Sequence, residues 1–311
     1  MALVQAGEEP GFREAVFAWL RSRMLVTPVF SRDDLAAAEI GGRTVRLIAT
    51  QSGIWKPKGT MAALSFTTGY YVDESSRPYA DGIGPDELLR YKWRGTDPNH
   101  IDNRALRAAM EMQVPLIWFV GIGHRPGTNT QVFQPVMPVW LIAEEPEQHQ
   151  FVVALDASQR ELVGHGQLHV SEIERRYNLV TAKQRLHQPL FRTRVLHAYE
   201  RRCAVCRLPF GELLDAAHIK SDSEGGSAKV SNGLSLCRIH HGAYDTNILG
   251  IDPDYKVVIK DSVLATFDGP TLQHAFKEMH GAQLAQLPTA RAERPDRGLL
   301  DERFQSFLRA S

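Results

Sequence analysis

The pattern of apolar and polar positions predicts a helical start to this chain of 311 residues. In residues 12–24 the large apolar side chains recur at the spacing of one helix face. Ser31 followed by Asp34 is typical of a helix N-terminus and predicts a second helix that runs to Ala38. Residues 1–44 are therefore interpreted as a helical lead-in to the next domain, with a winged-helix fragment as the alternative.

The pattern changes from about residue 45 to residue 157, where short apolar runs alternate with turns rich in Gly, Pro, Asp and Asn. One helix is predicted among them, over residues 103–112. This pattern is typical of a β-rich domain, barrel-like or sandwich-like, with a single helical insertion. The predicted strands are TVRLIA, MAALSFTTGYYV, LLRYKWRG, VPLIWFVGI, PVMPVWLIA and FVVALD.

The rest of the chain is predicted to contain several helices. Residues 158–187 are expected to form a helical linker, and another helix is expected over residues 191–199. The stretch 175–202 holds eight Lys and Arg residues and one Glu. It is interpreted either as a solvated helix face or as a surface that contacts phosphate groups. Beyond Asp261 the chain is again predicted to be helical, with a Pro- and Arg-rich break near residues 291–297.

The composition is that of an ordinary globular protein, with 43% hydrophobic and 23% charged residues. No apolar run approaches the roughly eighteen residues of a membrane helix, and no secretory signal is visible. The formal net charge is zero, which argues against a globally basic nucleic-acid coat protein but not against a local basic surface. We therefore expect a cytoplasmic protein of about two domains.

All three cysteines lie in one short segment, so they require a joint explanation. Cys203 and Cys206 form a CxxC sequence, and Cys237 and His240 form a CxxH sequence. Zinc prefers four sulfur and nitrogen ligands of this kind in a tetrahedron, so the two pairs predict one structural zinc ion. Buried free thiols are one alternative. A redox-active CxxC pair is another, although no βαβ pattern surrounds this pair.

Three further polar residues occur in order along the same segment. His218 lies near the end of LLDAAHI, a short apolar stretch that is predicted to be a strand. Asn232 begins the turn before LSLC, and His241 opens the predicted helix HHGAYDTNIL. The predicted order of elements is therefore strand, loop, strand or turn, and helix.

This segment resembles the HNH nuclease family, whose catalytic unit is the ββα-metal fold. The matching sequences are AHIKSDSEGG, SNGLSLC and HHGAYD, and FRTRVLHAYERRCAVC resembles the helix and zinc knuckle of many bacterial HNH proteins. The resemblance covers about residues 188–255 and points to McrA-like, modification-dependent restriction enzymes. It implies that His218 is the general base, Asn232 the central asparagine and His241 a ligand of the catalytic metal. Because Asn232 does not titrate, it is expected to hold the loop and to orient His218.

The chemistry of such a nuclease suits these residue types. Histidine can take a proton from water at neutral pH, and a divalent cation, Mg²⁺ or Mn²⁺, stabilises charge on the phosphate and the leaving group. The family usually places a second metal ligand directly before the general base, where this chain has Ala217. Asp215, two positions earlier in the strand, is the expected substitute. Asp245, one helical turn after His241, is the alternative.

The β-rich stretch 45–157 resembles SRA-type domains, which are PUA-like barrels that bind DNA with a modified cytosine and flip the base into an aromatic pocket. The shared features are a strand that ends in Gly-Tyr, a YKWRG turn, and DNRALR before a strand. A flipped base needs aromatic faces and a polar group at its edge, although each aromatic residue can instead be core packing. The candidate stacking residues are Trp55, Tyr70, Tyr91 and Trp93, and the candidate polar acceptor is Asp97.

The sequence therefore predicts an α+β protein in which a PUA- or SRA-like barrel precedes a zinc-stabilised ββα-metal nuclease domain. The expected activity is hydrolysis of double-stranded DNA that carries 5-methylcytosine or 5-hydroxymethylcytosine, as in type IV-like or type IIM-like restriction enzymes. The alternatives are recognition of an unmodified or phosphorothioate-marked sequence, and an inactive DNA-binding zinc module. Because one HNH centre cuts one strand, a homodimer is expected on DNA. The predicted segments are 1–44 (lead-in), 45–157 (reader), 158–187 (linker), 188–265 (nuclease) and 266–311 (C-terminal helical extension).

Overall fold

The computed structural model describes residues 7–72, 82–161 and 171–310. The chain divides into two compact units, Met1–His187 and Gln188–Ser311. Both units contain helices and strands, which confirms the predicted α+β class. No helix within the described ranges is both long and apolar enough to cross a membrane.

A seven-stranded sheet forms the centre of the first unit. Six strands follow the order β4-β5-β7-β8-β9-β6, and β1 also pairs with β8. All pairs are antiparallel except β5 with β7. The strands are β1 (Phe30–Ser31), β4 (Ile54–Trp55), β5 (Ser65–Thr68), β6 (Leu89–Lys92), β7 (Leu116–His124), β8 (Gln131–Glu145) and β9 (Gln150–Ala154), and a separate hairpin joins β2 (Ala38–Ile40) to β3 (Arg43–Val45).

The sheet is open, since no pairing among the described strands joins β4 to β6. The long strand β8 explains this arrangement. It pairs with β7 through residues 131–139 and with β9 through residues 140–145, so the two halves of the sheet lie along different parts of one strand. The structure is a half-barrel, and the closed PUA- or SRA-like barrel predicted from the sequence is not confirmed.

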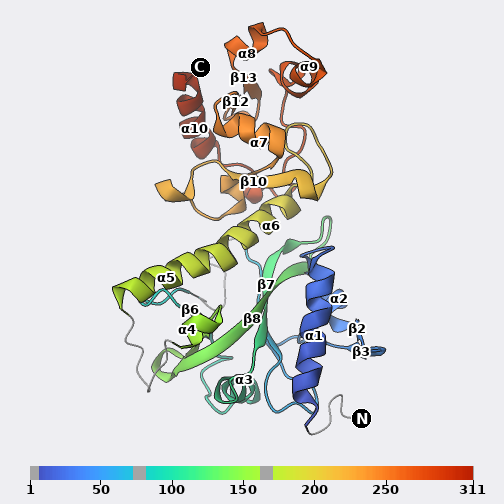
Figure 1. Cartoon of the computed structure of the whole chain (residues 1–311), viewed down its shortest axis with the longest axis vertical. Coiled ribbons are helices and arrows are strands. Elements are labelled where there is room, and N and C mark those ends of the chain that lie inside the picture. Colours follow the sequence, from blue (N-terminus) through green and yellow to red (C-terminus); the bar gives the residue numbers. More distant parts are fainter. Residues whose placement is uncertain (1–6, 73–81, 162–170, 311) are drawn as a thin grey trace. The chain divides into compact units, whose positions relative to one another are not determined.

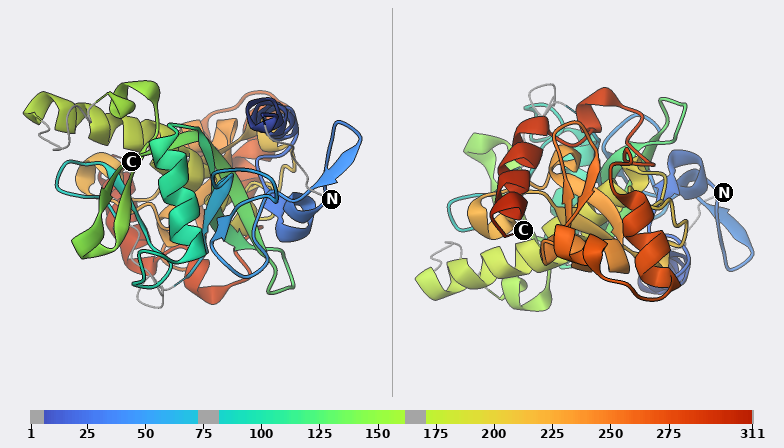
Figure 2. Two further views of the ribbon diagram at one scale, coloured as in Figure 1. Left: turned by 90° about the horizontal axis from the view of Figure 1, so that it is seen from below. Right: turned by 90° about the horizontal axis from the view of Figure 1, so that it is seen from above.

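Helix α1 (Glu9–Met24) packs against the sheet of the first unit (Figure 1). Its buried apolar face shares a core with Phe119 of β7, which confirms the helix predicted from the apolar spacing. Helix α2 (Arg32–Ala36) begins at a capping box between Ser31 and Asp34, also as predicted. The other helices of this unit are α3 (Ile101–Glu111), which packs against β8 (Figure 2), α4 (Ala157–Arg160) and α5 (Glu172–Ala182).

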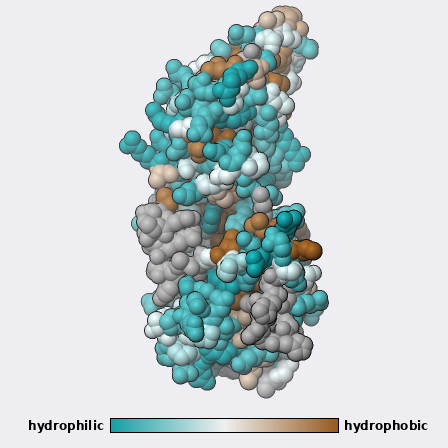
Figure 3. Space-filling model, turned by 90° about the vertical axis from the view of Figure 1, so that its left-hand side faces the viewer, coloured by the Kyte–Doolittle hydropathy of each residue, from teal (hydrophilic) through white to brown (hydrophobic). Residues whose placement is uncertain are grey.

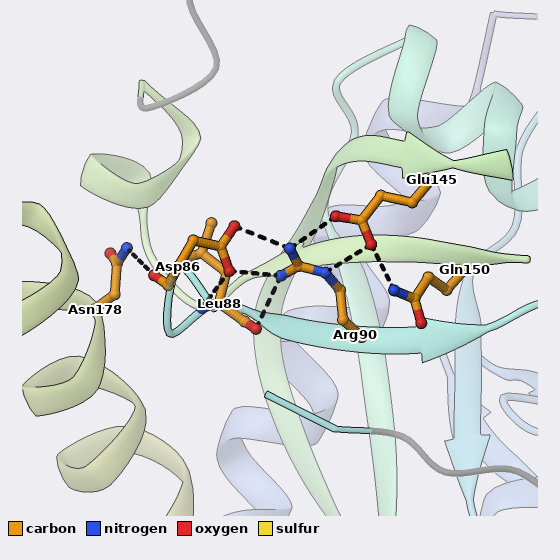
Figure 4. A network of polar contacts seen from close by, with 6 residues as sticks. All are labelled: Asp86, Leu88, Arg90, Glu145, Gln150 and Asn178. Carbon is orange, nitrogen blue, oxygen red and sulfur yellow. Dashed lines mark hydrogen bonds and ion pairs between the residues drawn. The ribbon is translucent and has the colours of Figure 1, made fainter. Parts of the chain in front are cut away.

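A buried ion cluster fixes α5 to the end of this sheet (Figure 4). Arg90 of β6 is 5% exposed, and its guanidinium lies 2.9 Å from Asp86 and 2.8 Å from Glu145 of β8. Asn178 of α5 is fully buried and donates a hydrogen bond of 3.1 Å to the carbonyl oxygen of Asp86. Removing one partner of such a buried pair costs about 3–5 kcal/mol. The cluster therefore holds β6, β8 and α5 in one arrangement.

The second unit is built around the hairpin β10–β11 and the helix α7. The strands β10 (Leu214–His218) and β11 (Gly233–Cys237) are antiparallel, with His218 opposite Gly233. Helix α7 (Arg238–Asp245) follows β11 directly, so the order is ββα, and helix α6 (Gln188–Ala198) packs against both strands. The remaining elements are β12 (Leu249–Ile251), β13 (Val257–Ile259), α8 (Asp261–Ala265), α9 (Pro270–Ala275) and α10 (Arg297–Ala310).

Helix α10 completes the core of the second unit and lies beside β12 (Figure 2). Leu300 and Phe307 of this helix are almost fully buried. Gly250 of β12 is so close to the ring of Phe307 that an added Cβ would lie 2.7 Å from it. One hydrophobic core thus contains residues of both the predicted nuclease domain (188–265) and the predicted helical extension (266–311).

Candidate metal centre and nuclease site

The four predicted zinc ligands converge in the second unit. The ligand atoms of Cys203, Cys206, Cys237 and His240 all lie within 4.8 Å of one another. Nδ1 of His240 is 3.2 Å from Sγ of Cys237 and 3.6 Å from Sγ of Cys203. Ligand atoms of a tetrahedral zinc ion lie about 3.5–3.8 Å apart when the zinc–ligand bonds have their usual length of about 2.1–2.3 Å. The donor set and its spacing therefore fit one zinc ion.

The surroundings of His240 direct its ligand nitrogen at the sulfur atoms. The residue is 1% exposed, and its Nε2 lies 2.8 Å from the carbonyl oxygen of Ala275. A carbonyl oxygen only accepts, so in the neutral ring Nε2 carries the proton and Nδ1 presents a lone pair to the cysteines. Burial opposes a charge on the ring, but Cys203 and Cys237 outweigh this effect and raise the pKa of His240 to about 10. Zinc binding at these residues would therefore displace a proton from His240.

Strand β10 and helix α7 place the predicted catalytic metal ligands side by side. Nδ1 of His241 is 3.7 Å from Oδ2 of Asp215, and Nε2 of His241 is 3.4 Å from Oδ2 of Asp245. Both candidate carboxylates therefore lie next to the histidine, and Arg192 of α6 lies 3.8 Å from Asp215. Ala217, at the position where the family usually has a ligand, is buried in the core.

The predicted general base is held by an aromatic ring that the sequence analysis did not single out. The ring of Phe191 on α6 stacks on the imidazole of His218, with centroids 3.9 Å apart and planes at 11°. Gly233, opposite His218 in the hairpin, permits this approach. A Cβ at Gly233 would lie 2.4 Å from Val195 and 3.0 Å from the ring of Phe191. The stacking restricts the orientation of the imidazole plane.

Asn232 fastens the loop that follows His218. It is fully buried, and its Oδ1 accepts a hydrogen bond of 2.9 Å from the amide of Lys220. Its Nδ2 donates to the carbonyl oxygens of Lys220, at 3.0 Å, and Ser227, at 2.9 Å. Both amide protons are thus used on the loop backbone. These contacts are those expected of a residue that holds the loop. Asn232 can affect the position of His218 through the backbone of this loop.

The aromatic residues predicted to read a base lie mostly inside the first unit. Tyr70, Tyr91 and Trp93 are 8%, 6% and 3% exposed. The ring of Tyr91 packs 4.5 Å from that of Phe66, and Trp93 meets His149 edge-on at 5.3 Å. This burial favours core packing, the alternative interpretation, over an open stacking surface for these three side chains.

The other two predicted reading residues are more accessible. Trp55 of β4 is half-buried, and its indole Nε1 donates a hydrogen bond of 2.8 Å to the carbonyl oxygen of Arg46. Asp97 is exposed and accepts a hydrogen bond of 2.8 Å from the amide of Asn99, which forms a local turn. These two side chains are therefore better placed to meet a ligand than the buried aromatics.

Three contributors to the site were not predicted from the sequence. Phe191 and Arg192 lie in a helix that was predicted, but no local pattern says which of its side chains would face the hairpin. Ala275 acts through its backbone carbonyl, a group that every residue carries. Such contacts depend on tertiary packing between segments that are far apart in the sequence.

Comparison with known protein families defines the class of the second unit. Residues 203–252 match the family model described as HNH endonuclease, and this match confirms the resemblance inferred from AHIKSDSEGG, SNGLSLC and HHGAYD. The matched segment contains the ββα order, the four zinc-ligand candidates and the three predicted nuclease residues. A search of curated proteins finds no match to the chain.

Three solved structures show a weak similarity. The "Modification dependent TagI restriction endonuclease" is 18% identical, with 88% of this chain and 89% of that chain covered and a TM-score of 0.27. The "Type IV phosphorothioation-dependent restriction endonuclease ScoMcrA" is 15% identical, with 70% and 55% covered and a TM-score of 0.27. KRYPTONITE, in complex with mCHH DNA, an H3(1-15) peptide and SAH, is 15% identical, with 44% and 35% covered and a TM-score of 0.21. Scores this low add nothing to the argument about the fold.

Proposed function

We propose that the second unit is a metal-dependent DNA endonuclease that hydrolyses phosphodiester bonds. The observation that carries the proposal is the ββα arrangement within residues 203–252, which places Asp215 and Asp245 beside His241 and stacks Phe191 on His218. Phosphodiester hydrolysis requires groups of this kind: a base and ligands for a cation.

His218 acts as the general base and takes a proton from the attacking water. Phe191 keeps the imidazole in one plane, and Asn232 holds the loop that begins after His218. His241 would hold a divalent cation together with Asp215 or Asp245, since Mg²⁺ is commonly bound by only one or two carboxylates. When bound, the cation stabilises negative charge on the phosphate and the leaving oxygen.

The cysteine cluster has a structural role in this proposal. Cys203 and Cys206 come from the turn after α6, Cys237 ends β11, and His240 lies in the first turns of α7. A zinc ion on these residues ties α6, the hairpin and α7 together, in a closed four-ligand site typical of structural zinc.

Plasmid nicking by His218→Ala tests the nuclease assignment. The variant should cut about a hundredfold to ten-thousandfold more slowly with Mg²⁺ or Mn²⁺, because the general base is lost. Its affinity for DNA should stay close to that of the unchanged protein. His274→Ala is the matched control, since His274 is an exposed histidine on α9. Normal nicking by His218→Ala would remove His218 from the mechanism, and DNA binding without any nicking by the unchanged protein would favour an inactive zinc module.

We further propose that the first unit directs cutting to modified DNA. The support is the resemblance of residues 45–157 to SRA-type domains and the presence of a separate compact unit before the nuclease. Matched duplexes that carry cytosine, 5-methylcytosine, 5-hydroxymethylcytosine or a phosphorothioate linkage would separate the possible targets. Equal binding and cutting of all four would leave the nuclease standing and remove the reader.

A double-strand break would need two of these centres, so we propose that two copies of the chain act together on DNA. The rate of double-strand cutting should then rise more steeply than linearly with protein concentration, while nicking rises linearly. A linear rise of both rates would indicate that one chain acts alone.

A further inference from the structure

A cleft of about 830 Å³ lies where helix α10 begins in the second unit. Three arginines line it, Arg291, Arg294 and Arg297, together with Ser231 and Tyr255. All three arginines are exposed to solvent. The surface of the second unit is largely hydrophilic on the face shown in Figure 3.

Two of the arginines are held in place by the protein. Nε of Arg294 donates a hydrogen bond of 3.2 Å to the carbonyl oxygen of Pro288. Arg297 lies over the ring of Tyr255 at 5.3 Å and contacts Asp254 at 3.3 Å. A preorganised guanidinium loses less entropy when it binds a phosphate, and its fork of donors matches two phosphate oxygens.

One acidic residue, Asp296, also lines the cleft. Oδ1 of Asp296 accepts hydrogen bonds from the amides of Gly298, at 2.8 Å, and Leu299, at 3.0 Å, so it caps the first turn of α10. Three guanidinium groups therefore face two carboxylates, that of Asp296 and that of Asp254, which contacts Arg297. The cleft has a net positive charge.

The backbone connects this cleft to the nuclease site. The amide of Asp296 donates a hydrogen bond of 2.9 Å to the carbonyl oxygen of Ser231, the residue directly before Asn232. We propose that the arginine cleft binds backbone phosphates of the DNA strand away from the phosphate that is cut. This inference rests on the proposed function, because it assigns a second contact with the same substrate.

The test compares two double variants that remove the same charge, both in the full chain carrying His218→Ala to prevent cutting. Arg291→Ala with Arg294→Ala alters the cleft, and Arg21→Ala with Arg309→Ala removes two exposed arginines elsewhere. The dissociation constant for a duplex is measured by fluorescence anisotropy at several salt concentrations. Circular dichroism confirms that both variants fold.

The cleft variant should bind DNA roughly tenfold or more weakly at 0.15 M salt. The slope of the logarithm of its affinity against the logarithm of the salt concentration should become shallower by the amount expected for about two lost phosphate contacts. The control should bind like the parent. Equal affinity and equal salt slope for both double variants would overturn the proposal, even if the unchanged protein cuts DNA. If the cleft variant loses affinity but the unchanged protein never nicks DNA, the proposed function fails and the cleft assignment stands.

Discussion

The three hydrogen bonds of Asn232 allow a quantitative prediction for Asn232→Ala. The substitution leaves the amide of Lys220 and the carbonyl oxygens of Lys220 and Ser227 without their present partner. At a net value of about 0.5–1.5 kcal/mol for each bond, the second unit should lose about 2–4 kcal/mol of unfolding free energy. Domains are typically stable by roughly 5–15 kcal/mol, so the variant should still fold.

Urea unfolding can report on the two units separately. All five tryptophans belong to the first unit: Trp19, Trp55, Trp93, Trp118 and Trp140. Circular dichroism should therefore show the second unit of Asn232→Ala unfolding at a urea concentration lower by about 1–2 M, while the transition in tryptophan fluorescence does not move. The cleavage rate at saturating Mg²⁺ should fall roughly a hundredfold, because the loop after His218 loses its position.

Two variants sharpen the test. Asn232→Asp keeps the shape but places an acceptor against two carbonyl oxygens, so it should destabilise the unit at least as much as Asn232→Ala. Ser231→Ala alters a neighbouring side chain and should leave both transitions unchanged. The prediction would be refuted if the second unit of Asn232→Ala unfolded at the same urea concentration as that of Ser231→Ala and the variant cut DNA at the normal rate.

Three more predictions concern the metal sites and the general base. Elemental analysis should find about one tightly bound zinc per chain. Cys237→Ser should abolish the circular-dichroism transition of the second unit, while the transition in tryptophan fluorescence stays normal. A zinc-free protein with both transitions intact would contradict the zinc assignment. Asp215→Ala should need more Mg²⁺ for half-maximal nicking than Asp245→Ala, and the reverse order would make Asp245 the ligand. Phe191→Leu should slow nicking several-fold at an unchanged dissociation constant for DNA, whereas an unchanged rate would show that the stacked ring does not position His218.

The sequence predicts the second unit well because its chemistry is encoded locally. The spacing of Cys203, Cys206, Cys237 and His240 specifies two short ligand pairs, and the structure brings all four together. The capping box at Ser31 is equally local. Each of these signals lies within a few residues of chain, where spacing alone constrains geometry.

The first unit is harder to predict because its arrangement depends on long-range pairing. Periodicity indicates the strands, but it does not say that β8 pairs with β7 and β9 along different halves. Tyr91 and Trp93 are aromatic residues in or beside a predicted turn. The local sequence does not distinguish an aromatic side chain that faces a ligand from one that packs in the core. Their burial is decided by neighbours such as Phe66 and Phe151 on other strands.

The position of α10 in the core also bears on the biosynthesis of this protein. His241 precedes Phe307 in the chain, and the ring of Phe307 closes the core over Gly250. At roughly 5–20 residues per second, a ribosome needs about 3–13 s to synthesise the chain from His241 to Phe307. During that interval the proposed nuclease residues already exist, but the core that supports them is unfinished. A nascent chain, or one truncated before α10, would lack the packing of Phe307 against Gly250, so the core around the proposed nuclease residues is completed only by the last helix of the chain.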